Sequence, residues 1–349
     1  ARIAILTTPE GHFSIAKAME ETLQTVHETR MISIRDSVFE LYTPFYQFFP
    51  SMYHVPYALS KQTAISTQVV AYLRKKLMKQ VAKFIEESQL DIIINTMWIY
   101  RPALETLEKK NHIPIINVIT DPWSIHPLFI SEVAKSNLVF DEKTLKACQS
   151  YNPDATYDVT GWFVRKAFYQ KTNATAFKKQ LKLDPKQQTI LIAGGSEGTT
   201  MIVKLVPALM QLAKPINIIV MCGNNKSLLN SIKSLSKIIK AVSNQSHVVP
   251  VGFTHDVAEY MGVADLIIGK AGPNTIFETV AARKPFIAVT HISGQEDGNL
   301  DLIKQYKLGY VEENAIKVVK LLQGVLKNPA RLKKLAPSIA KMADINHDA

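Results

Sequence analysis

Residues 265–299 read DLIIGKAGPNTIFETVAARKPFIAVTHISGQEDGN, and they decide the fold. The apolar run 266–268 is typical of a buried parallel strand, and the turn residues 271–274 end it. A helix is expected next, with Asn274 or Thr275 as its N-cap, and Pro285 ends that helix before the apolar strand 286–289. This order predicts that a helix N-terminus lies at the carboxyl end of a parallel strand.

A helix N-terminus at that edge of a sheet favours phosphate, because it presents unpaired backbone N–H groups and the positive end of the helix dipole. Residues 265–289 are equally compatible with a strand-turn-helix-strand unit that has only a structural role. The polar loop 294–299, Gly-Gln-Glu-Asp-Gly-Asn, shifts the interpretation toward binding. Its hydrogen-bonding groups beside a phosphate site suit a polyhydroxylated ligand.

Apolar strand-like runs alternate with helical periodicity along the whole chain, which predicts a doubly wound α/β architecture. In the first half, strands are expected near 2–7, 30–34, 91–95, 114–119 and 137–140. In the second half, they are expected near 156–160, 189–193, 216–221, 247–251, 265–269 and 285–289. The pattern restarts after Gly161. We therefore expect an N-terminal Rossmann-like domain over 1–160 and a C-terminal one over 161–349, whose last helix is a candidate to pack back on the first domain.

Length and composition agree with this division. A chain of 349 residues is long enough for two domains with a core each. The sequence holds no run of 18 apolar residues and opens on the strand-like stretch 2–6, so neither a membrane-spanning helix nor a signal peptide is expected. Cys148 and Cys222 stand alone, outside any metal or redox spacing, and are expected to be packing residues. The expected compartment is the cytoplasm.

The positive charge is concentrated in the second half of the chain. The formal net charge is +11, and residues 161–349 hold 25 Lys and Arg against 13 Asp and Glu. No RNP-like, KH-like or zinc-finger pattern accompanies this charge, so a nucleic-acid partner is not expected. A solvated lysine-rich surface, attraction to anionic lipid headgroups and attraction to a nucleotide diphosphate all remain open.

The segment 265–299 resembles the donor-site signature of the family 28 glycosyltransferases. Its ending, G-Q-E-x-G-N, is similar to the branch that contains monogalactosyldiacylglycerol synthases and processive diacylglycerol glucosyltransferases. The resemblance extends over nearly the whole chain. It implies a GT-B fold, with two Rossmann-like domains facing across a cleft. It also implies an inverting hexosyltransferase that moves galactose or glucose from a UDP-sugar to diacylglycerol or a similar lipid.

The same resemblance implies a donor site in the second domain. Its residues are Arg165, Gly194, Gly195, Ser196, Gly198, Phe253, Gly272, Asn274, Thr275, Glu278, Gln295, Glu296 and Asn299. Glu278 would bond the ribose hydroxyls, Phe253 would lie beside uracil, and Gln295 and Glu296 would bond the sugar. Arg165 ends a segment similar to V-T-G-x-P-V-R, in which Phe163 replaces the usual proline; its guanidinium offers paired donors to the diphosphate. The glycine loop 194–198 can form an anion nest.

Two residues of the first domain are candidate catalytic groups. His12 ends a turn similar to T-x-G-G-G-H, in which Pro9 and Glu10 replace two glycines. A helix N-terminus keeps such an imidazole neutral and able to accept a proton, although capping or packing is an alternative role. Asp121 lies in a segment similar to T-D-x-x-x-x-H-P, where a carboxylate can take the acceptor proton or orient His12. His126 of that segment is either functional or a turn residue.

Residues 39–60 combine eight aromatic side chains with three prolines, and a helix with a cationic side is expected from about 61 to 87. An aromatic loop beside a basic amphipathic helix is typical of a membrane-interface anchor. The residues expected to contact the acceptor or an anionic membrane surface are Phe45, Tyr46, Phe48, Phe49, Tyr53, Arg74, Lys75 and Lys79. The alternative is an aromatic minicore with a solvated helix face.

No D-x-D motif occurs, so neither a metal nor a cofactor is expected, and the UDP-sugar is a substrate. In this interpretation helix dipole, N–H groups and Arg165 stabilise the departing UDP. The enzyme would be peripheral on the inner face of the cell membrane. The alternatives are a UDP-N-acetylglucosamine transferase acting on a polyprenyl-linked acceptor, a UDP-sugar epimerase, and a UDP-sugar-binding protein without turnover. The sequence leaves the oligomeric state open.

Overall fold

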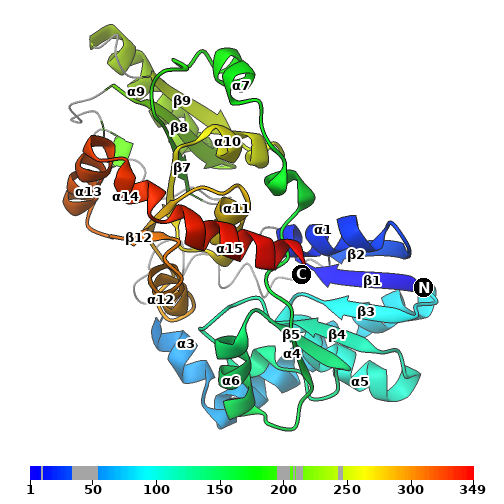
Figure 1. The fold of residues 1–349 in the computed structure, drawn as a ribbon. Coiled ribbons are helices and arrows are strands. Elements are labelled where there is room, and N and C mark those ends of the chain that lie inside the picture. The colour runs from blue at the N-terminus through cyan, green and yellow to red at the C-terminus, as the bar shows by residue number, and fades with distance from the viewer. Residues whose placement is uncertain (9–10, 34–53, 195–204, 207–208, 210–214, 243–246) are drawn as a thin grey trace. The chain divides into compact units, whose positions relative to one another are not determined.

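The computed structural model describes residues 1–8, 11–33, 54–194, 205–206, 209, 215–242 and 247–349 (Figure 1). Contacts divide the chain into two compact units. Unit 1 comprises Ala1–Arg165, Ile292–Asn299 and Asp348–Ala349, and unit 2 comprises Lys166–His291 and Leu300–His347. The segment 292–299 therefore groups with unit 1, although the chain on both sides of it belongs to unit 2.

Unit 1 is built on a parallel sheet with the strand order β2-β1-β3-β4-β5-β6. The strands are β1 (Arg2–Thr7), β2 (Glu28–Ser33), β3 (Ile92–Asn95), β4 (Ile115–Val118), β5 (Ser136–Val139) and β6 (Tyr157–Val159). The helices are α1 (Gly11–Leu23), α3 (His54–Ser60), α4 (Thr63–Glu87), α5 (Arg101–Asn111) and α6 (Glu142–Tyr151), with 3₁₀ turns η2 (Trp98–Tyr100) and η3 (Pro127–Phe129). β1 is buried from Ile3 to Thr7, as expected for a central parallel strand.

Unit 2 repeats this design with the strand order β12-β11-β10-β7-β8-β9. The strands are β7 (Thr189–Ala193), β8 (Asn217–Gly223), β9 (His247–Gly252), β10 (Leu266–Lys270), β11 (Phe286–Thr290) and β12 (Gly309–Val311). The helices are α7 (Ala174–Gln180), α9 (Lys226–Val242), α10 (Val257–Val263), α11 (Pro273–Ala281), α13 (Ala315–Lys327), α14 (Ala330–Lys333) and α15 (Ala336–His347), with the 3₁₀ turn η4 (Lys166–Tyr169). Helix α12 (Asp297–Gln305) begins in the segment that groups with unit 1.

The periodicity of the sequence is confirmed in both units. Each strand expected from an apolar run is present, and both sheets are parallel. Helix α4 buries Leu73, Leu77, Val81 and Ile85, which recur every four residues and pack on the core of unit 1. The doubly wound α/β prediction therefore holds for each unit.

Several local expectations were wrong. β6 was expected in the second half of the chain, but it pairs with β5 in the first sheet. β12 was not predicted, because its three residues, Gly-Tyr-Val, form no recognisable apolar run. Helix α11 begins at Pro273 with Gly272 as its N-cap, and not at Asn274 or Thr275. Proline at the first helical position explains the shift, since its fixed φ suits that position and no N–H is required there.

The end of the aromatic, proline-rich stretch forms the short helix α3. Helix α15, red in Figure 1, packs against α11 within unit 2, and only residues 348–349 group with unit 1. In the part of the chain that the structure describes, no helix combines the length and apolarity needed to cross a bilayer.

Three buried asparagines are hydrogen-bonded in series across adjacent strands of unit 1. Asn95 Nδ2 donates to Asn117 Oδ1 at 2.9 Å, and Asn117 Nδ2 donates to Asn137 Oδ1 at 2.8 Å. Asn117 Nδ2 also donates to the carbonyl of Phe129, and Asn137 Oδ1 accepts from Ser131 N–H. The series therefore fixes both the register of three strands and the far end of the loop that follows β4.

We expect Asn117→Ala to lower the free energy of unfolding by about 2–4 kcal/mol, because it leaves Asn95 Nδ2 and the Phe129 carbonyl buried without a partner. Urea denaturation followed by circular dichroism measures this loss. The control is Asn173→Ala, which removes an exposed N-cap of α7 and should cost about 1 kcal/mol. Equal losses in the two variants would contradict the role given to the asparagine series.

Candidate active site

His12 and Thr96 meet at the point where the strand order of unit 1 reverses. The chain continues from β1 to β2 on one side, whereas β3 lies on the other side of β1. Open parallel sheets bind ligands at the carboxyl ends of the strands at such a point. His12 is in the first turn of α1, after β1, and Thr96 follows β3. The two are joined by a hydrogen bond of 2.8 Å between His12 Nδ1 and the Thr96 carbonyl.

This bond sets the tautomer of His12. A carbonyl oxygen only accepts hydrogen bonds, so Nδ1 carries the proton and Nε2 keeps its lone pair. Burial lowers the pKa of His12 to about 4, and the bond to Thr96 opposes that shift only in part. The ring is therefore neutral at pH 7, with Nε2 as a proton acceptor. The neutral ring was predicted from the sequence, which gave the helix N-terminus as the cause. In the structure, the main cause of the lowered pKa is burial.

Asp121 is buried, with 4% of its surface exposed, and its Oδ1 accepts a hydrogen bond from Gln295 Nε2 at 3.1 Å. Both residues belong to unit 1. Gln295 was expected to bond the sugar and Asp121 to take the acceptor proton, so the structure brings together two residues expected to serve different reactants. Asp121 was also a candidate to orient His12, but the group that bonds Nδ1 of the His12 ring is the Thr96 carbonyl.

The turn 292–299 is held by hydrogen bonds within itself and to Ser124. Glu296 is 3% exposed, and its Oε2 accepts from Ile292 N–H at 2.7 Å. Asn299 is equally buried, and its N–H donates to the Glu296 carbonyl. Gly298 N–H donates to Ser124 Oγ at 2.8 Å. Glu296 therefore shapes the turn, and its contact with a sugar stays a prediction.

His126, whose role the sequence left open, is 2% exposed; it lies on the loop that follows β4 and contacts helix α3. Its Nδ1 accepts from Leu128 N–H at 3.1 Å, capping η3, and its Nε2 is 2.9 Å from Ser60 Oγ. Burial lowers the pKa of His126 to about 4, and the charge of Lys61 lowers it further. His126 is thus a neutral, internal residue.

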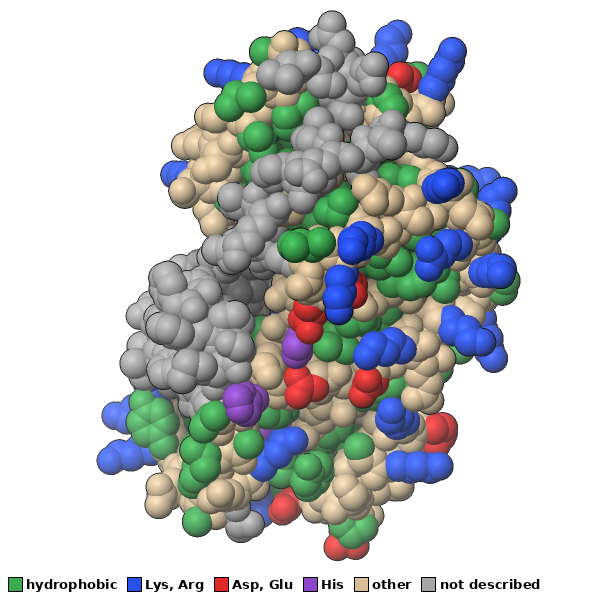
Figure 2. Space-filling model, turned by 90° about the vertical axis from the view of Figure 1, so that its left-hand side faces the viewer, with side chains coloured by type: hydrophobic (Ala, Val, Ile, Leu, Met, Phe, Trp, Pro, Cys, Tyr) green, Lys and Arg blue, Asp and Glu red, His purple; other side chains and the backbone are tan. Residues whose placement is uncertain are grey.

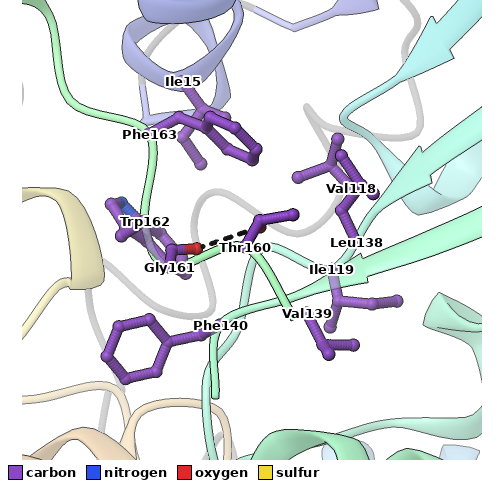
Figure 3. Close-up of a pocket in the computed structure, with 10 residues that line it drawn as sticks. All are labelled: Ile15, Val118, Ile119, Leu138, Val139, Phe140, Thr160, Gly161, Trp162 and Phe163. Carbon is purple, nitrogen blue, oxygen red and sulfur yellow. Dashed lines mark hydrogen bonds between the residues drawn. The ribbon is translucent and has the colours of Figure 1, made fainter. Parts of the chain in front are cut away.

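A small apolar pocket lies at the carboxyl ends of β4, β5 and β6 in unit 1 (Figure 3). Its lining includes Ile15 of α1, one turn beyond His12, and residues 160–163 of the segment similar to V-T-G-x-P-V-R. Figure 3 shows Ile15 and Phe163 on one side, with Val118 and Leu138 opposite. Thr160 Oγ bonds the Gly161 carbonyl. The lining contains no charged side chain, so this pocket does not suit the phosphates of a donor.

In unit 2, Gly194 and Gly272 lie where the strand order of the sheet reverses. β7 and β10 are neighbours in the sheet, while β8 and β9 lie beyond β7 and β11 and β12 lie beyond β10. Gly194 follows β7, and Gly272 follows β10 as the N-cap of α11. The strands approach so closely that a Cβ added at Gly269 would lie 2.5 Å from the Ala193 carbonyl oxygen. Gly194 and the N-terminus of α11 thus lie at the carboxyl ends of two adjacent strands.

The remaining donor candidates have the following positions. Asn274 and Thr275 lie in the first turn of α11, and Glu278 lies one turn later; all three are partly exposed. Phe253 follows β9, is 58% exposed and packs edge-on against His255. Arg165 ends unit 1 directly before η4 and is partly buried. Gly195, Ser196 and Gly198 lie outside the described residues, as do Phe45, Tyr46, Phe48, Phe49 and Tyr53.

The cationic side of α4 is exposed. Arg74, Lys75 and Lys79 are solvent-exposed, as is Lys83. Tyr72 is 53% exposed and lies under the ammonium group of Lys76, 5.6 Å from its ring centre. Figure 2 shows that basic side chains are more widespread than acidic ones on the face that it draws. Within the described ranges, no cluster of three His, Cys, Asp or Glu side chains could hold a metal ion.

Sequence reasoning missed Thr96, Ser124, Ser60 and Tyr57. Thr96 acts at His12 through its backbone carbonyl, which every residue type supplies, so no sequence signal identifies it. Ser124 lies inside the T-D-x-x-x-x-H-P-like segment, and its proximity to Asp121 was the available signal. Ser60 and Tyr57 lie at the end of the aromatic stretch, where composition suggested a surface role.

The depressed pKa values predict a specific acid sensitivity. Between pH 6.5 and about 4 the unfolded chain protonates His12 while the folded chain does not, so stability falls as the pH is lowered through this window. The expected slope is about 1.4 kcal/mol per pH unit for each such histidine. Urea midpoints recorded at several pH values should therefore decline less steeply in His12→Gln than in the wild type. Parallel curves for the two proteins would contradict the neutral state of His12.

Two family models match consecutive regions of the chain. Residues 13–162 match the family model of monogalactosyldiacylglycerol (MGDG) synthase, and residues 189–348 match the glycosyltransferase family 28 C-terminal domain. The probable monogalactosyldiacylglycerol synthase 3 of Oryza sativa subsp. japonica is 28% identical over 270 residues, which cover 72% of this chain and 51% of that protein. The chain thus spans about half the length of this plant relative.

A bacterial relative and a solved structure extend the comparison. The processive diacylglycerol beta-glucosyltransferase of Bacillus subtilis (strain 168) is 24% identical over 266 residues, which cover 75% of this chain and 67% of that protein. The crystal structure of MurG from Acinetobacter baumannii has a TM-score of 0.64 at 16% identity and covers 97% of this chain and 94% of that chain. This likeness identifies the GT-B fold. The second half of the chain is thus of the glycosyltransferase family 28 type, and its first half is of the monogalactosyldiacylglycerol synthase type.

Proposed function

We propose that this protein transfers a hexose from a UDP-sugar to a hydroxyl of diacylglycerol or a similar lipid. The observation that carries the proposal is the neutral His12, whose Nε2 is a proton acceptor at the reversal point of the first sheet, directly before residues 13–162, which match the MGDG synthase model. The proposal also draws on the names of the relatives, a monogalactosyldiacylglycerol synthase and a diacylglycerol glucosyltransferase. The choice between galactose and glucose is left to the assay below.

In the proposed step, the lipid hydroxyl oxygen attacks the anomeric carbon of the sugar. The bond from that carbon to the β-phosphate oxygen breaks, and its electron pair leaves with UDP. The proton of the hydroxyl passes to His12 Nε2, which the Thr96 carbonyl keeps available. A single displacement of this kind inverts the configuration at the anomeric carbon. Asp121 is the alternative base, and its bond to Gln295 favours His12 in that role.

The donor would bind at the reversal point of the second sheet. The N-terminus of α11, with Gly272 as its N-cap, offers N–H groups and a positive dipole end to the diphosphate, and Asn274 and Thr275 lie in the same turn. Glu278 would accept hydrogen bonds from the ribose hydroxyls, and the exposed ring of Phe253 would lie beside uracil. Arg165 and the N–H groups would stabilise the departing UDP without a metal ion.

We further infer that the enzyme works on an anionic membrane surface, through α3 and α4. Helix α3 exposes Val55 and Leu59, which are 48% and 46% exposed, and α4 exposes Tyr72 and its cations. Aliphatic side chains beside cations and an aromatic ring are the combination that binds a headgroup layer. We also propose that this surface is the inner face of the cell membrane.

Two variants separate chemistry from donor binding. His12→Ala should lower the transfer rate by about 10²–10⁴-fold, the usual contribution of a general base, and leave the Kd for UDP unchanged. Glu278→Ala should raise the Kd for UDP about tenfold or more, because it removes a charged hydrogen-bond acceptor. Calorimetric titration of UDP and a radiolabelled transfer assay measure the two effects, and each variant is the control for the other. Full transfer by His12→Ala would remove His12 from the mechanism.

Membrane attraction is tested by removing charge from α4. Lys75→Gln combined with Lys79→Gln should weaken binding to phosphatidylglycerol-containing vesicles about tenfold or more, since each basic residue near an anionic surface contributes about 1 kcal/mol. Vesicle sedimentation measures the binding. Lys233→Gln combined with Lys237→Gln is the matched control, because it removes two exposed charges at the same spacing from α9 of unit 2. The same loss in both double variants would show that net charge, and not this helix, drives the attraction.

A product assay decides among the alternatives. Purified protein is incubated with a panel of UDP-sugars and mixed lipid acceptors, and label is followed into the lipid phase. Label in diacylglycerol supports the proposal, and label in a polyprenyl-linked acceptor supports the related transferase. Conversion of the UDP-sugar alone indicates an epimerase. Tight UDP-sugar binding without any product indicates a binding protein.

A further inference from the structure

The turn 294–298 rests on two elements of unit 1. Helix α3 lies against Gly294, where an added Cβ would be 3.0 Å from His54 Cα and 3.2 Å from Tyr57 Cδ1. Gly294 also has φ +88°, which other residue types adopt only with strain. The loop 121–126 holds the other side of the turn, through the bonds from Gln295 to Asp121 and from Gly298 to Ser124.

The two supporting elements are themselves joined. Tyr57 Oη donates to the Ser124 carbonyl at 2.6 Å, and the Tyr57 ring packs edge-on against His126 with centroids 5.2 Å apart. His126 Nε2 is 2.9 Å from Ser60 Oγ, and Ser60 Oγ is 2.8 Å from the Tyr57 carbonyl. All of these groups are in unit 1.

The direction of the hydrogen bonds between His126, Ser60 and Tyr57 follows from the groups at the two ends of this series, the Leu128 N–H and the Tyr57 carbonyl. His126 Nδ1 accepts from Leu128 N–H, so in the neutral ring the proton is on Nε2. Nε2–H therefore donates to Ser60 Oγ, and the Ser60 hydroxyl donates to the Tyr57 carbonyl. Ser60 thus has its proton committed to the backbone and is not a nucleophile. The chain of bonds runs from η3 through His126 and Ser60 to α3.

We propose that His126 is a positioning residue. By donating to Ser60 it joins α3 to the loop 121–126, and these two elements together keep Gln295 of the turn 294–298 bonded to Asp121. Its functional meaning rests on the proposed function and on the expectation from the sequence that Gln295 bonds the sugar and Asp121 serves the acceptor. His126 contacts neither reactant in this scheme. Its action passes through Ser60 and Tyr57 to the turn.

The two ring nitrogens of His126 can be separated by mutation. The amide oxygen of Asn is placed like Nδ1, so His126→Asn keeps an acceptor for Leu128 N–H and loses the bond to Ser60. The amide nitrogen of Gln is placed like Nε2, so His126→Gln keeps a donor to Ser60 and loses the cap of η3. A positioning role through Ser60 predicts that His126→Asn is the more damaging variant for the turn. A capping role alone predicts the reverse order.

The direct measurement is amide hydrogen exchange of the peptide that covers 292–299. His126→Asn and Ser60→Ala should speed its exchange about tenfold, the effect of losing one typical buried hydrogen bond, while His126→Gln should remain within about threefold of the wild type. Ser150→Ala is the matched control. It removes a similar bond from a serine hydroxyl to the carbonyl three residues earlier, but in α6, without a histidine partner.

Steady-state kinetics give the second measurement. His126→Asn and Ser60→Ala should raise KM for the UDP-sugar about tenfold with smaller changes in kcat, and His126→Gln should largely restore KM. Melting curves identify any variant that fails to fold, and Ser60→Ala then carries the test alone. Faster exchange in His126→Gln than in His126→Asn, or unchanged exchange in Ser60→Ala, overturns the inference. The exchange experiment needs no turnover, so an absence of transfer by the wild type would refute the proposed function and leave the positioning role of His126 standing.

Discussion

The side-chain series Asn95–Asn117–Asn137 is the constraint on which the arrangement of unit 1 depends. Parallel strands place their carboxyl ends along one edge, but the loops beyond them are positioned only if something fixes their far ends. Asn117 does this by bonding both neighbouring asparagines and the carbonyl of Phe129, where the loop after β4 returns to the sheet. Asp121, Ser124 and His126 all lie on that loop. A buried amide in the sheet thereby sets the positions of residues that belong to the candidate site.

The main elements of the fold were predictable because they depend on periodicity. Buried parallel strands are continuous apolar runs, and α4 shows its core stripe in the spacing of Leu73, Leu77 and Val81. β12 escaped prediction because three residues at a sheet edge carry too little pattern. The start of α11 was misplaced because two good capping residues follow a proline that already occupies the first helical position. These errors are local, and they concern one edge strand and the start of one helix.

The candidate site was predictable in its residue types and not in its contacts. Resemblance in the segments around His12, Asp121 and 265–299 identified the residues that are able to take part in catalysis or binding. It did not show that Thr96 fixes the tautomer of His12 through a backbone carbonyl, or that Gln295 bonds Asp121. Such contacts join residues that are far apart in sequence, and a single sequence holds no record of which distant positions meet. Glu296 illustrates the point, because its carboxylate bonds a backbone N–H within its own turn.

The grouping of residues 292–299 with unit 1 has a consequence for the order in which the protein assembles. The chain passes from one unit to the other after Arg165, His291, Asn299 and His347. On the ribosome, the first sheet and its helices are complete once residue 165 has emerged, but the place against Tyr57 and Asp121 stays empty until about 130 further residues have been made. The first unit is therefore finished only by a segment from within the second. Cutting the gene at residue 165 would separate two sheets but would not yield two intact halves.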